Sequence, residues 1–495
     1  MSKRRSVEGK RLGELAAAVG VSCEGPASRV VVHGVCEDSR RVRSGDLFVA
    51  IPGTHRDGVS FAREAVRRGA VAVVGQVPVD ADVPNLLVDD ARRALAALAA
   101  AFFDHPTRDL HTIGVTGTNG KTTVCHWAAH LLGSERSELL STVTNADSFE
   151  PGLGELTTPP APIVQRVARE ALDAGASNLI VEASSIGLAQ WRLDDVEFDV
   201  CAFTNLSRDH LDLHGNLADY TAAKSRLFAS LDRSGCAVLN ADDPSADAVL
   251  GDCTAQVLRV SRCGAGDLVA REVIEEGGRT RFRMISGGAS HDVSLPVIGA
   301  HNVENALVAA GIAVASGLRL ADVAGRLSSI PNVPGRQSVY RDGAGRTIVI
   351  DFAHNPDALE RVLRALRERY KRLVAVFGCP GESDRGKRAM MGEVAGRLTD
   401  LTILTSDNPK HEAPDAIAEE IAAGLRRVGG RSEIVLDREE AIGRAVDGAN
   451  TRDCVLVAGK GHERVQLVGD DRLPYSDAAV VESLGFAPVK RGVVD

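Results

Sequence analysis

Short apolar runs separated by polar loops make up the first part of the chain. They are RVVVHGV (29–35), DLFVAIPG (46–53), AVAVVG (70–75) and NLLVDD (85–90). Their valines and isoleucines favour strands, and an alanine-rich run of helical character follows over residues 91–103. The segment DHPTRDL (104–110) reads as a linker, because Pro106 biases the residue before it away from helix. The pattern predicts a first α/β domain over residues 1–107.

The middle of the chain alternates strongly apolar runs with helical segments. The runs are TIGVTG (112–117), SNLIVEASS (177–185), FDVCAFTNLS (198–207) and CAVLNADD (236–243), and a helical run follows at 302–317. Strands that are apolar throughout are typical of parallel sheets covered by helices on both faces. The segment SSIPNVPGR (328–336) marks a second boundary. We therefore predict a central α/β domain, residues 108–336, on a mostly parallel sheet.

The last part of the chain, residues 337–495, predicts a third α/β domain. Its strand-like runs are RTIVIDFA (346–353), RLVAVFG (372–378), LTILTSD (401–407) and CVLVAGK (454–460). Polar loops follow them directly, namely DFAHNPD, GCPGESDRGKR, SDNPKHEAP and GKGHE. In open α/β sheets, ligands bind at the carboxyl ends of the strands. These loops are therefore expected to line a binding site.

The composition narrows the classes of partner. A net charge of −9 and a pI near 5.9 argue against nucleic acid or an anionic membrane. The longest apolar run, residues 94–103, is far shorter than the ~20 residues of a membrane span, and Glu14 interrupts any signal-peptide pattern. The nine cysteines form no C-x-x-C pair. We expect free thiols and a cytoplasmic protein.

The segment IGVTGTNGKTT (113–123) resembles a phosphate-binding loop whose glycines are shifted. The usual loop has a glycine five residues before the Gly-Lys pair, but Val115 stands there. Glycines let backbone N–H groups approach phosphates, and the following helix adds a favourable dipole. Lys121 can reach the β and γ oxygens, and Thr122 can place its hydroxyl on Mg²⁺. The alternative is a glycine-rich turn with a chance lysine.

Three residues elsewhere are candidate partners of a metal-bound triphosphate. Glu182 ends an apolar run, and His210 follows the next one within TNLSRDHLD. A lone histidine is often structural, but the neighbouring charged residues favour function. Lys224, in DYTAAKSRLF, reads as an exposed helical lysine from its spacing alone.

Two further segments carry groups that suit a nucleotide. In DFAHNPD, Asp351 and His354 suit a ribose or a phosphate, although helix capping by Asn355 is an alternative. In GAHNVENA, Asn302 and Asn305 suit a base or a helix cap. The residues alone leave both choices open.

Several motifs, taken in order, resemble the Mur ligases. They are TGTNGKTT, EASS, FTNLSRDHLDLHG, YTAAK, GAHNVEN, PGR, DFAHNPDALE, DNP and AGKGHE, and the resemblance spans about residues 35–482. The N-terminal EDSRRVRSGDLFVAIPG narrows it to members that add a diamino acid to UDP-N-acetylmuramoyl-L-alanyl-D-glutamate. The GTNGK form of the loop is the family's own version, so Val115 is no defect.

The resemblance implies a UDP-binding N-terminal domain, a central ATPase and a C-terminal Rossmann-like domain that brings the amino acid. It implies an ATP-dependent ligase of peptidoglycan synthesis that converts a carboxylate to an acyl phosphate, which an amine then attacks. The catalytic residues carried over are Lys121, Glu182, His210 and Lys224. Metal ligands at two Mg²⁺ sites would be Thr122, Glu182, His210 and Lys224, the last matching a lysine that the family carbamylates.

The resemblance also assigns binding residues. Around ATP it places Gly117, Thr118, Asn119, Gly120, Lys121, Thr122, Thr123, Asn302, Arg336, Asp351 and His354. Around the UDP-linked muramoyl peptide it places Ser39, His55, Thr157, Thr158, Ser184, Gln190 and Arg192. Around the amino acid it places Arg385, Asp407, Asn408, Lys410, Gly459 and Glu463. A monomer is expected.

Departures from the family pattern gather at substrate recognition. Ile186 stands where histidine is usual, and Ser338 where glutamate is usual. In the amino-acid pocket, Ser383 replaces an arginine, and Lys410 stands where diaminopimelate-adding members have arginine. Arginine offers a planar bidentate fork and lysine a mobile point charge. We expect a weakened or rebuilt carboxylate clamp, with Arg385 as a substitute cation, and weak binding of meso-diaminopimelate.

Three functions remain open at this point. The first is a cell-wall ligase that adds meso-diaminopimelate or a similar diamino acid. The second is a paralogue that ligates a different amine, in specialised metabolism. The third is a catalytically dead binding homologue, which the intact Lys121, Glu182, His210 and Lys224 disfavour.

Overall fold

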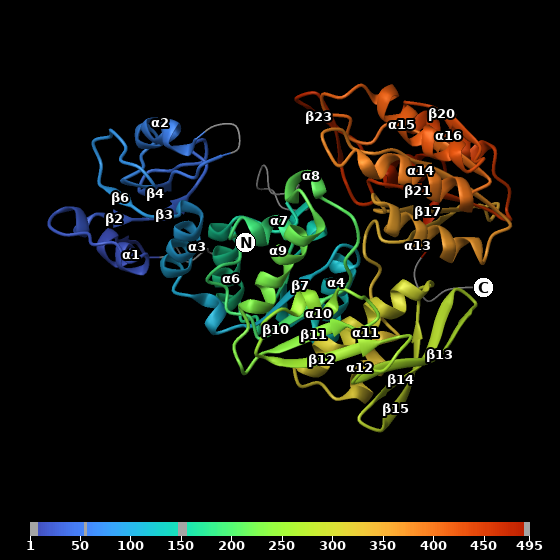
Figure 1. Ribbon diagram of the computed structural model, residues 1–495, viewed down its shortest axis with the longest axis horizontal. Helices are drawn as coiled ribbons and strands as arrows, with labels where there is room; N and C mark the ends of the chain where they lie inside the picture. Colours follow the sequence, from blue (N-terminus) through green and yellow to red (C-terminus); the bar gives the residue numbers. More distant parts are fainter. Residues whose placement is uncertain (1–7, 54–56, 147–155, 490–495) are drawn as a thin grey trace. The chain divides into compact units, whose positions relative to one another are not determined.

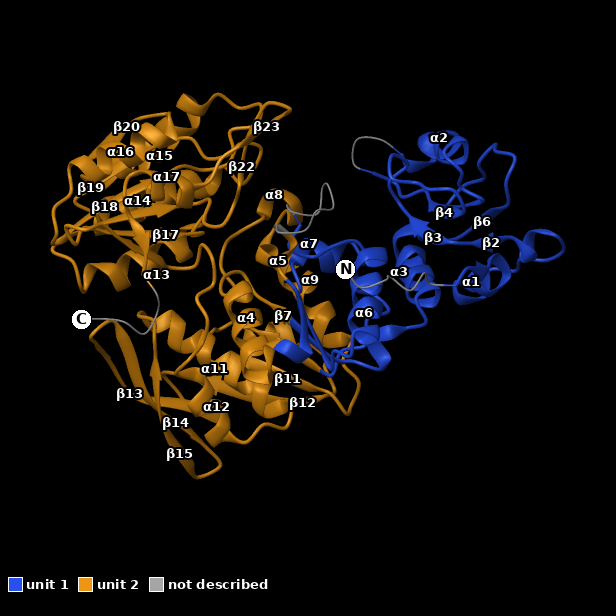
Figure 2. Cartoon of the chain, turned by 180° about the vertical axis from the view of Figure 1, so that it is seen from behind, with its two compact units in different colours: residues 1–114, 135–140, 156–199 blue, residues 115–134, 141–155, 200–495 orange. Residues whose placement is uncertain are grey.

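The computed structural model describes residues 8–53, 57–146 and 156–489 (Figure 1). Figure 2 shows two compact units. Unit 1 comprises residues 1–114, 135–140 and 156–199, and unit 2 comprises residues 115–134, 141–155 and 200–495. Among the helices of the described ranges, none is long and apolar enough to cross a membrane.

Unit 1 begins with a four-stranded parallel sheet whose two faces are covered differently. Its order is β3 (Gly34–Cys36), β4 (Asp46–Val49), β5 (Ala72–Gly75) and β6 (Asn85–Leu87). Leu47 and Val49 of β4 pack with α1 (Leu12–Ala18) and α3 (Ala91–Phe102). Phe48, between them, packs with α2 (Ala62–Arg67). This alternation of side chains along β4 buries both faces of the sheet.

The rest of unit 1 includes residues 135–140 and 156–199, which the sequence analysis assigned to the central domain. A short antiparallel pair joins β1 (Lys10–Arg11) to β2 (Val31–Val32). β8 (Ser137–Leu140) and β9 (Asn178–Glu182) run parallel. Two helices accompany them, α6 (Ala161–Asp173) and α7 (Ser185–Ala189). β7 (His111–Thr116) carries the chain from unit 1 into unit 2.

The first half of unit 2 is a sheet in the order β15-β14-β13-β12-β11-β10. The parallel strands predicted at 198–207 and 236–243 are β10 (Val200–Phe203) and β11 (Cys236–Asn240), and β12 (Gln256–Ser261) extends them. The helices of this region are α4 (Lys121–Leu132), α5 (Thr142–Ala146), α8 (Leu211–His214), α9 (Leu217–Ala229), α10 (Ala246–Leu250), α11 (Ala300–Ala315) and α12 (Leu320–Leu327). The apolar helix predicted at 302–317 is α11, which is buried along nearly its whole length.

Two antiparallel hairpins, which the sequence analysis did not predict, extend this sheet. They join β13 (Leu268–Glu276), β14 (Arg279–Ser286) and β15 (Ala289–Leu295). Gly-Gly pairs at 277–278 and 287–288 form the turns, and all four glycines have positive φ. Glycine takes this conformation without steric cost, so such pairs are typical hairpin turns.

The second half of unit 2 is a seven-stranded sheet, coloured orange to red in Figure 1. Its order is β20 (Ser432–Ile434), β19 (Leu401–Leu404), β18 (Arg372–Phe377), β21 (Asp453–Ala458), β17 (Thr347–Asp351), β16 (Ser338–Arg341) and β24 (Ala487–Pro488). The four predicted strands are the parallel centre, β19-β18-β21-β17. A separate hairpin pairs β22 (Val465–Val468) with β23 (Asp471–Pro474).

Helices cover both faces of the seven-stranded sheet. One face packs against α13 (Pro356–Arg367), α14 (Gly386–Leu398) and α15 (Pro414–Arg427). The other packs against α16 (Arg438–Asp447) and α17 (Asp477–Ser483). This is the covered parallel sheet that the apolar runs predicted.

The linker before β16 packs tightly against the loop after β21. Gly335 has a φ of 67°, and a Cβ atom there would lie 2.3 Å from the backbone nitrogen of His462 and 2.5 Å from the carbonyl carbon of Gly461. Its own carbonyl accepts a hydrogen bond from Phe352 N at 2.9 Å. Only glycine fits at this crossing.

Candidate active site

The glycines of the phosphate loop leave no room for side chains. Gly117 has a φ of 148°, and a Cβ atom there would lie 1.9 Å from Thr204 Oγ1. Gly120, at a φ of 87°, caps α4, and its Cβ would lie 2.3 Å from Asn305 Oδ1. Loop backbone and the N-terminus of α4 can therefore approach an anion closely. The shifted glycines are required by the neighbouring segments of this chain.

The segment after β10 braces the loop. Thr118 N donates to Asn205 O at 2.7 Å, and Asn119 N donates to Asn205 Oδ1 at 2.9 Å. Thr204 Oγ1 donates to Asn119 O at 2.7 Å. The loop is thus held from outside in one conformation, a form of preorganisation for ligand binding.

Two predicted cations contact the loop. Lys121 Nζ donates to Gly117 O at 3.1 Å and to Thr118 O at 2.9 Å. Arg336, from the linker, donates through Nη2 to Thr122 Oγ1 at 3.0 Å. The structure therefore brings Lys121, Thr122 and Arg336 together although Arg336 is far away in sequence.

Lys224 is buried, so its interpretation as an exposed helical lysine is wrong. Only 1% of the residue is exposed on α9. Its Nζ donates to Gly117 O at 2.8 Å and lies 4.3 Å from the centre of the Tyr220 ring. Burial, with the nearby charge of Lys121, holds the pKa of Lys224 well below its ordinary value. The amine therefore lies buried against the phosphate loop.

His210 lies beside a buried carboxylate that the sequence analysis did not single out. Asp209 Oδ1 accepts the backbone N–H of His210 at 3.0 Å, and its Oδ2 accepts from Asn355 Nδ2 at 3.1 Å. His354 Nε2 lies 3.2 Å from Oδ2, and Lys387 Nζ lies 3.6 Å from Oδ1. Burial alone would raise the pKa of Asp209. The effects of His354 and Lys387 are opposite and larger, so the pKa lies well below its ordinary value. The carboxylate is thus ionised.

Further contacts connect the phosphate loop with the C-terminal domain. Asn119 Nδ2 donates to Asp357 Oδ2 at 2.8 Å, and Asn355 Nδ2 donates to Asn119 Oδ1 at 2.9 Å. Arg336 Nη1 lies 3.5 Å from His462 Nδ1. Residues from DFAHNPD, PGR and AGKGHE therefore meet at one place, which their separation in sequence did not reveal.

Asp351 and Asn302 are both held by Gln337, the residue after PGR. Asp351 Oδ2 accepts from Gln337 N at 2.7 Å, and its Oδ1 accepts from Ala353 N at 2.8 Å. Asn302 Nδ2 donates to Gln337 Oε1 at 3.0 Å and to Ile298 O at 2.7 Å. Burial raises the pKa of Asp351. The sequence analysis did not single out Gln337.

The two helix-capping alternatives have opposite outcomes. The N-cap of α11 is Gly299, so Asn302 lies inside the helix and does not cap it. Asn355 is the N-cap of α13, and its Oδ1 accepts from Ala358 N at 2.9 Å. The capping interpretation is therefore wrong for Asn302 and correct for Asn355.

Unit 1 holds a compact group of the residues predicted to bind the UDP-linked peptide. Thr158 Oγ1 donates to Glu182 O at 2.6 Å and lies 3.0 Å from Ser184 Oγ. Arg192 donates through Nη1 to Thr158 O at 2.7 Å and through Nη2 to Gln190 Oε1 at 2.6 Å. Four of the predicted residues thus lie together through their own hydrogen bonds.

The remaining predictions for unit 1 are placed as follows. Ser39 is buried after β3, and Thr157 precedes Thr158 in the chain. Glu182 is buried at the carboxyl end of β9. His55 lies outside the described residues.

In the predicted amino-acid pocket, Glu463 is held by two residues. Its Oε2 accepts from Lys460 Nζ at 2.8 Å and from Asn408 Nδ2 at 3.0 Å. Lys460, fully buried, also donates to Asn408 Oδ1 at 2.9 Å. Burial raises the pKa of Glu463. The sequence analysis did not single out Lys460, although it lies three residues before Glu463 and can therefore reach it.

Backbone contacts fix the neighbouring loop. Lys410 has a φ of 51°, its N–H donates to Leu467 O at 3.1 Å, and its carbonyl accepts from Gly469 N at 2.7 Å. Asp407 is buried, and a Cβ atom at Gly459 would lie 2.6 Å from its Oδ2. The loop after β19 is thus tied to the β22–β23 hairpin.

The substitute cation predicted for the pocket is engaged elsewhere. Arg385 is exposed and pairs with Glu420 of α15. Its neighbour Arg388 is buried and pairs with Glu412 at 2.9 Å and with Glu420 at 3.0 Å. A contact of Arg385 with the amino acid remains a prediction.

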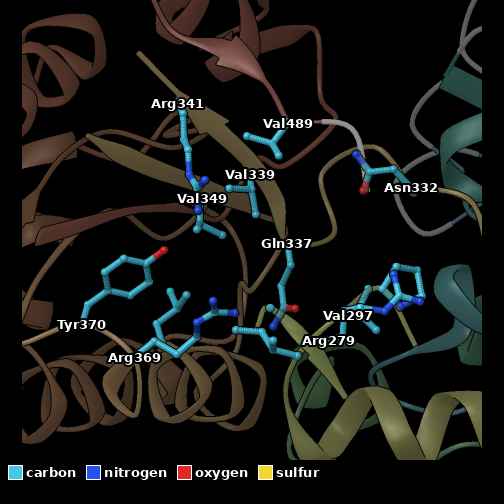
Figure 3. A pocket seen from close by; sticks show the side chains of 14 residues that line it. Arg279, Val297, Asn332, Gln337, Val339, Arg341, Val349, Arg369, Tyr370 and Val489 are labelled. Atoms are coloured by element: carbon cyan, nitrogen blue, oxygen red, sulfur yellow. The ribbon is translucent and has the colours of Figure 1, made fainter. Parts of the chain in front are cut away.

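A cavity of about 90 Å³ lies beside the linker, and Gln337 is among the residues that line it. Figure 3 shows Arg341, Arg369, Tyr370 and Gln337 around it, with apolar side chains such as Val339 between them. None of the predicted site residues lines this cavity. It is therefore not the predicted nucleotide or amino-acid site.

Three family models match the chain. They are the Mur ligase family, catalytic domain, over residues 31–103, the Mur ligase middle domain over 115–313, and the Mur ligase, glutamate ligase domain over 335–461. The three-domain architecture is therefore that of the Mur ligases. The predicted boundaries at 107 and 336 stay predictions.

Named relatives agree with this match. The UDP-N-acetylmuramoyl-L-alanyl-D-glutamate--2,6-diaminopimelate ligase of Geobacillus kaustophilus (strain HTA426) is 41% identical over 458 residues, which are 90% of this chain and 93% of that protein. A solved structure with the same enzyme name is 32% identical, with a TM-score of 0.66, and the match covers 95% of this chain and 98% of that one.

A more distant structure shares the fold. The MurF ligase from Thermotoga maritima in complex with ADP has a TM-score of 0.62 at 23% identity, and the match covers 86% of this chain and 93% of that one. Taken with the family models and the full-length relative, these matches show that the chain belongs to the Mur ligase family.

Proposed function

We propose that this chain is an ATP-dependent ligase of peptidoglycan precursor synthesis. It converts the D-glutamyl carboxylate of UDP-N-acetylmuramoyl-L-alanyl-D-glutamate to an acyl phosphate and joins it to a diamino acid of the diaminopimelate type. The observation that carries the proposal is the set of Lys121, Arg336 and Lys224 around one phosphate loop. We further propose that it acts in the cytoplasm as a monomer.

The charge arrangement suits acyl phosphate formation. A carboxylate and a γ-phosphate are both anionic, so their approach requires preorganised cations and N–H groups. Lys121 and Arg336 provide cations, and the start of α4 provides a helix N-terminus. The complex of the Thermotoga maritima ligase with ADP supports the binding of a nucleotide.

Mg²⁺ is the proposed cofactor, and when bound it would offset the charge of the transferring phosphoryl group. The hydroxyl of Thr122 and the carboxylate of Glu182 offer the oxygen atoms that this ion prefers, and His210 would complete the set. Lys224 is buried and its pKa is lowered, which favours the uncharged amine, the form that reacts with carbon dioxide. A carbamate on Lys224 would supply a carboxylate-like ligand.

Different parts of the chain would hold the other two substrates. In unit 1, Arg192, Thr158 and Ser184 are proposed to bind the UDP-linked peptide. In the C-terminal domain, Glu463 would accept the distal ammonium of the diamino acid. Its Oε2 is already engaged by Lys460 and Asn408, and its Oε1, which has no hydrogen bond to another described residue, would receive the ligand.

The names of the relatives favour diaminopimelate over the alternative of an unrelated amine. Ser383 and Lys410 still predict a weaker hold on its distal carboxylate, because lysine lacks the bidentate geometry of arginine. The proposed substrate class and the proposed weakness of binding are therefore compatible.

A phosphate-release assay tests the function. The purified chain is given ATP, Mg²⁺ and the UDP-muramoyl dipeptide, with meso-diaminopimelate, L-lysine or other amines in parallel. We expect amine-dependent phosphate release that is fastest with meso-diaminopimelate, and a tripeptide product by mass spectrometry. Release only with an unrelated amine would favour the paralogue, and no release with any amine would contradict the ligase.

A further inference from the structure

Asp209 is a buried carboxylate that joins two domains. Its side chain is only 3% exposed. His354 and Asn355 reach it from the loop between β17 and α13, and Lys387 reaches it from the start of α14. All three belong to the C-terminal domain, whereas Asp209 follows β10 of the central domain.

The same carboxylate also fixes the backbone of the next residue. His210 has a φ of 53°, a left-handed conformation that is uncommon outside glycine. Its N–H donates to Asp209 Oδ1 at 3.0 Å, the same oxygen that Lys387 approaches at 3.6 Å. The Asp209 carboxylate thus supports the strained backbone at His210 and also contacts three residues of the C-terminal domain.

We propose that Asp209 is a positioning residue that couples docking of the C-terminal domain to the conformation of the His210 loop. When the C-terminal domain docks, Lys387, His354 and Asn355 fix the carboxylate, and the carboxylate fixes the backbone of His210. When that domain leaves, Asp209 loses these partners and its hold on the loop weakens. The effect of this coupling on catalysis rests on the proposed function, in which His210 is a ligand of Mg²⁺.

Another contact between the same domains offers a matched control. Glu304 of α11 accepts from Arg361 of α13 at 2.9 Å and from Arg262 at 3.3 Å. This carboxylate also joins the central and C-terminal domains, but it has no hydrogen bond to the 204–214 segment. If Asp209 were only a docking contact, changes at Asp209 and at Glu304 would have the same effects.

Hydrogen exchange on the ligand-free full chain tests the coupling. The variants are Lys387→Met and Asp209→Asn, with Glu304→Gln as control and thermal melts to confirm folding. Both test variants should exchange roughly tenfold faster in the peptide containing the His210 amide, because each weakens the support that the Asp209 carboxylate gives to this amide. Lys387→Arg, which keeps the cation, should retain most of the wild-type protection of the His210 amide against exchange.

Unchanged exchange at His210 in Lys387→Met would overturn the proposal, as would an equal increase in Glu304→Gln. The readout needs no activity, so it stands even if the wild-type chain ligates no amine and the proposed function fails. If the chain does ligate, Lys387→Met should lower kcat about tenfold with little change in KM for ATP. A change confined to KM would instead indicate a binding role.

Discussion

The proposed nucleotide site and the proposed amino-acid pocket draw their residues from the chain in different ways. One continuous segment, residues 113–123, supplies most of the nucleotide site, and its immediate support is another short segment at 204–205. The proposed amino-acid pocket takes its residues from the loops after β18, β19 and β21, which lie far apart in the chain. Its central residue, Glu463, depends on Lys460 and Asn408 for its position.

This difference between the loop and the pocket indicates which of the two can accept amino-acid substitutions. In the loop, a Cβ atom at Gly117 would lie 1.9 Å from Thr204 Oγ1, so changes there disturb the fold as well as the ligand. In the proposed pocket, Ser383 is half-buried. Specificity can therefore change in the pocket while the catalytic loop stays intact.

The largest effect is expected in the loop. Lys121→Ala removes the cation next to the proposed β and γ phosphates, and loss of such a charge costs on the order of 10³-fold or more in turnover. Phosphate release with saturating substrates measures the effect, with the exposed Lys371→Ala as control. Near-normal turnover in Lys121→Ala would contradict the proposal that this loop binds the phosphates of ATP.

The second prediction concerns Lys224, which contacts the loop from α9. Lys224→Ala should lose about 10²–10³-fold in turnover, the range for removing one electrostatic stabiliser at a reacting centre. If the lysine carries a carbamate, short-chain carboxylates such as acetate should restore part of the activity. Normal activity in the alanine variant would contradict both the catalytic role and the carbamate.

The smallest effect is expected in the pocket, and it is a gain. Ser383→Arg combined with Lys410→Arg restores the two arginines that the family pattern has, and one charged hydrogen-bonded pair contributes about 1.5–3 kcal/mol. KM for meso-diaminopimelate should fall roughly tenfold or more, with KM for ATP unchanged. Efficient use of diaminopimelate by the wild type, with no gain in the variant, would show that these positions do not set specificity.

Motifs read directly from the residues identified positions whose role depends on local order, whereas Arg336 came from the resemblance to the family. Lys121 and Thr122 follow a strand and begin a helix, and this order alone indicates a phosphate site. Asp209, Lys387 and Gln337 were missed because each acts on a segment far away in sequence. Lys224 was misjudged for a different reason. Its spacing in the helix does not show whether it is buried, because burial depends on the segment that packs against it, here the phosphate loop.

The fold shows the same division. The apolar runs at 346–353 and 454–460 predicted β17 and β21, which are buried on both faces. The hairpins β13–β15 were missed although Gly-Gly pairs at 277–278 and 287–288 mark their turns. These strands are polar and half-exposed, and they lack the continuous runs of apolar residues from which the other strands were predicted.

The close packing at Gly335 has a consequence for recombination between relatives. Because its α-carbon presses on the backbone of residues 461–462, the linker and the loop after β21 form one interlocking joint. A chimaera that takes its C-terminal domain from another member must inherit both halves of this joint from the same parent. Crossovers placed after the linker would pair mismatched surfaces, whereas crossovers before residue 335 would carry the joint across whole.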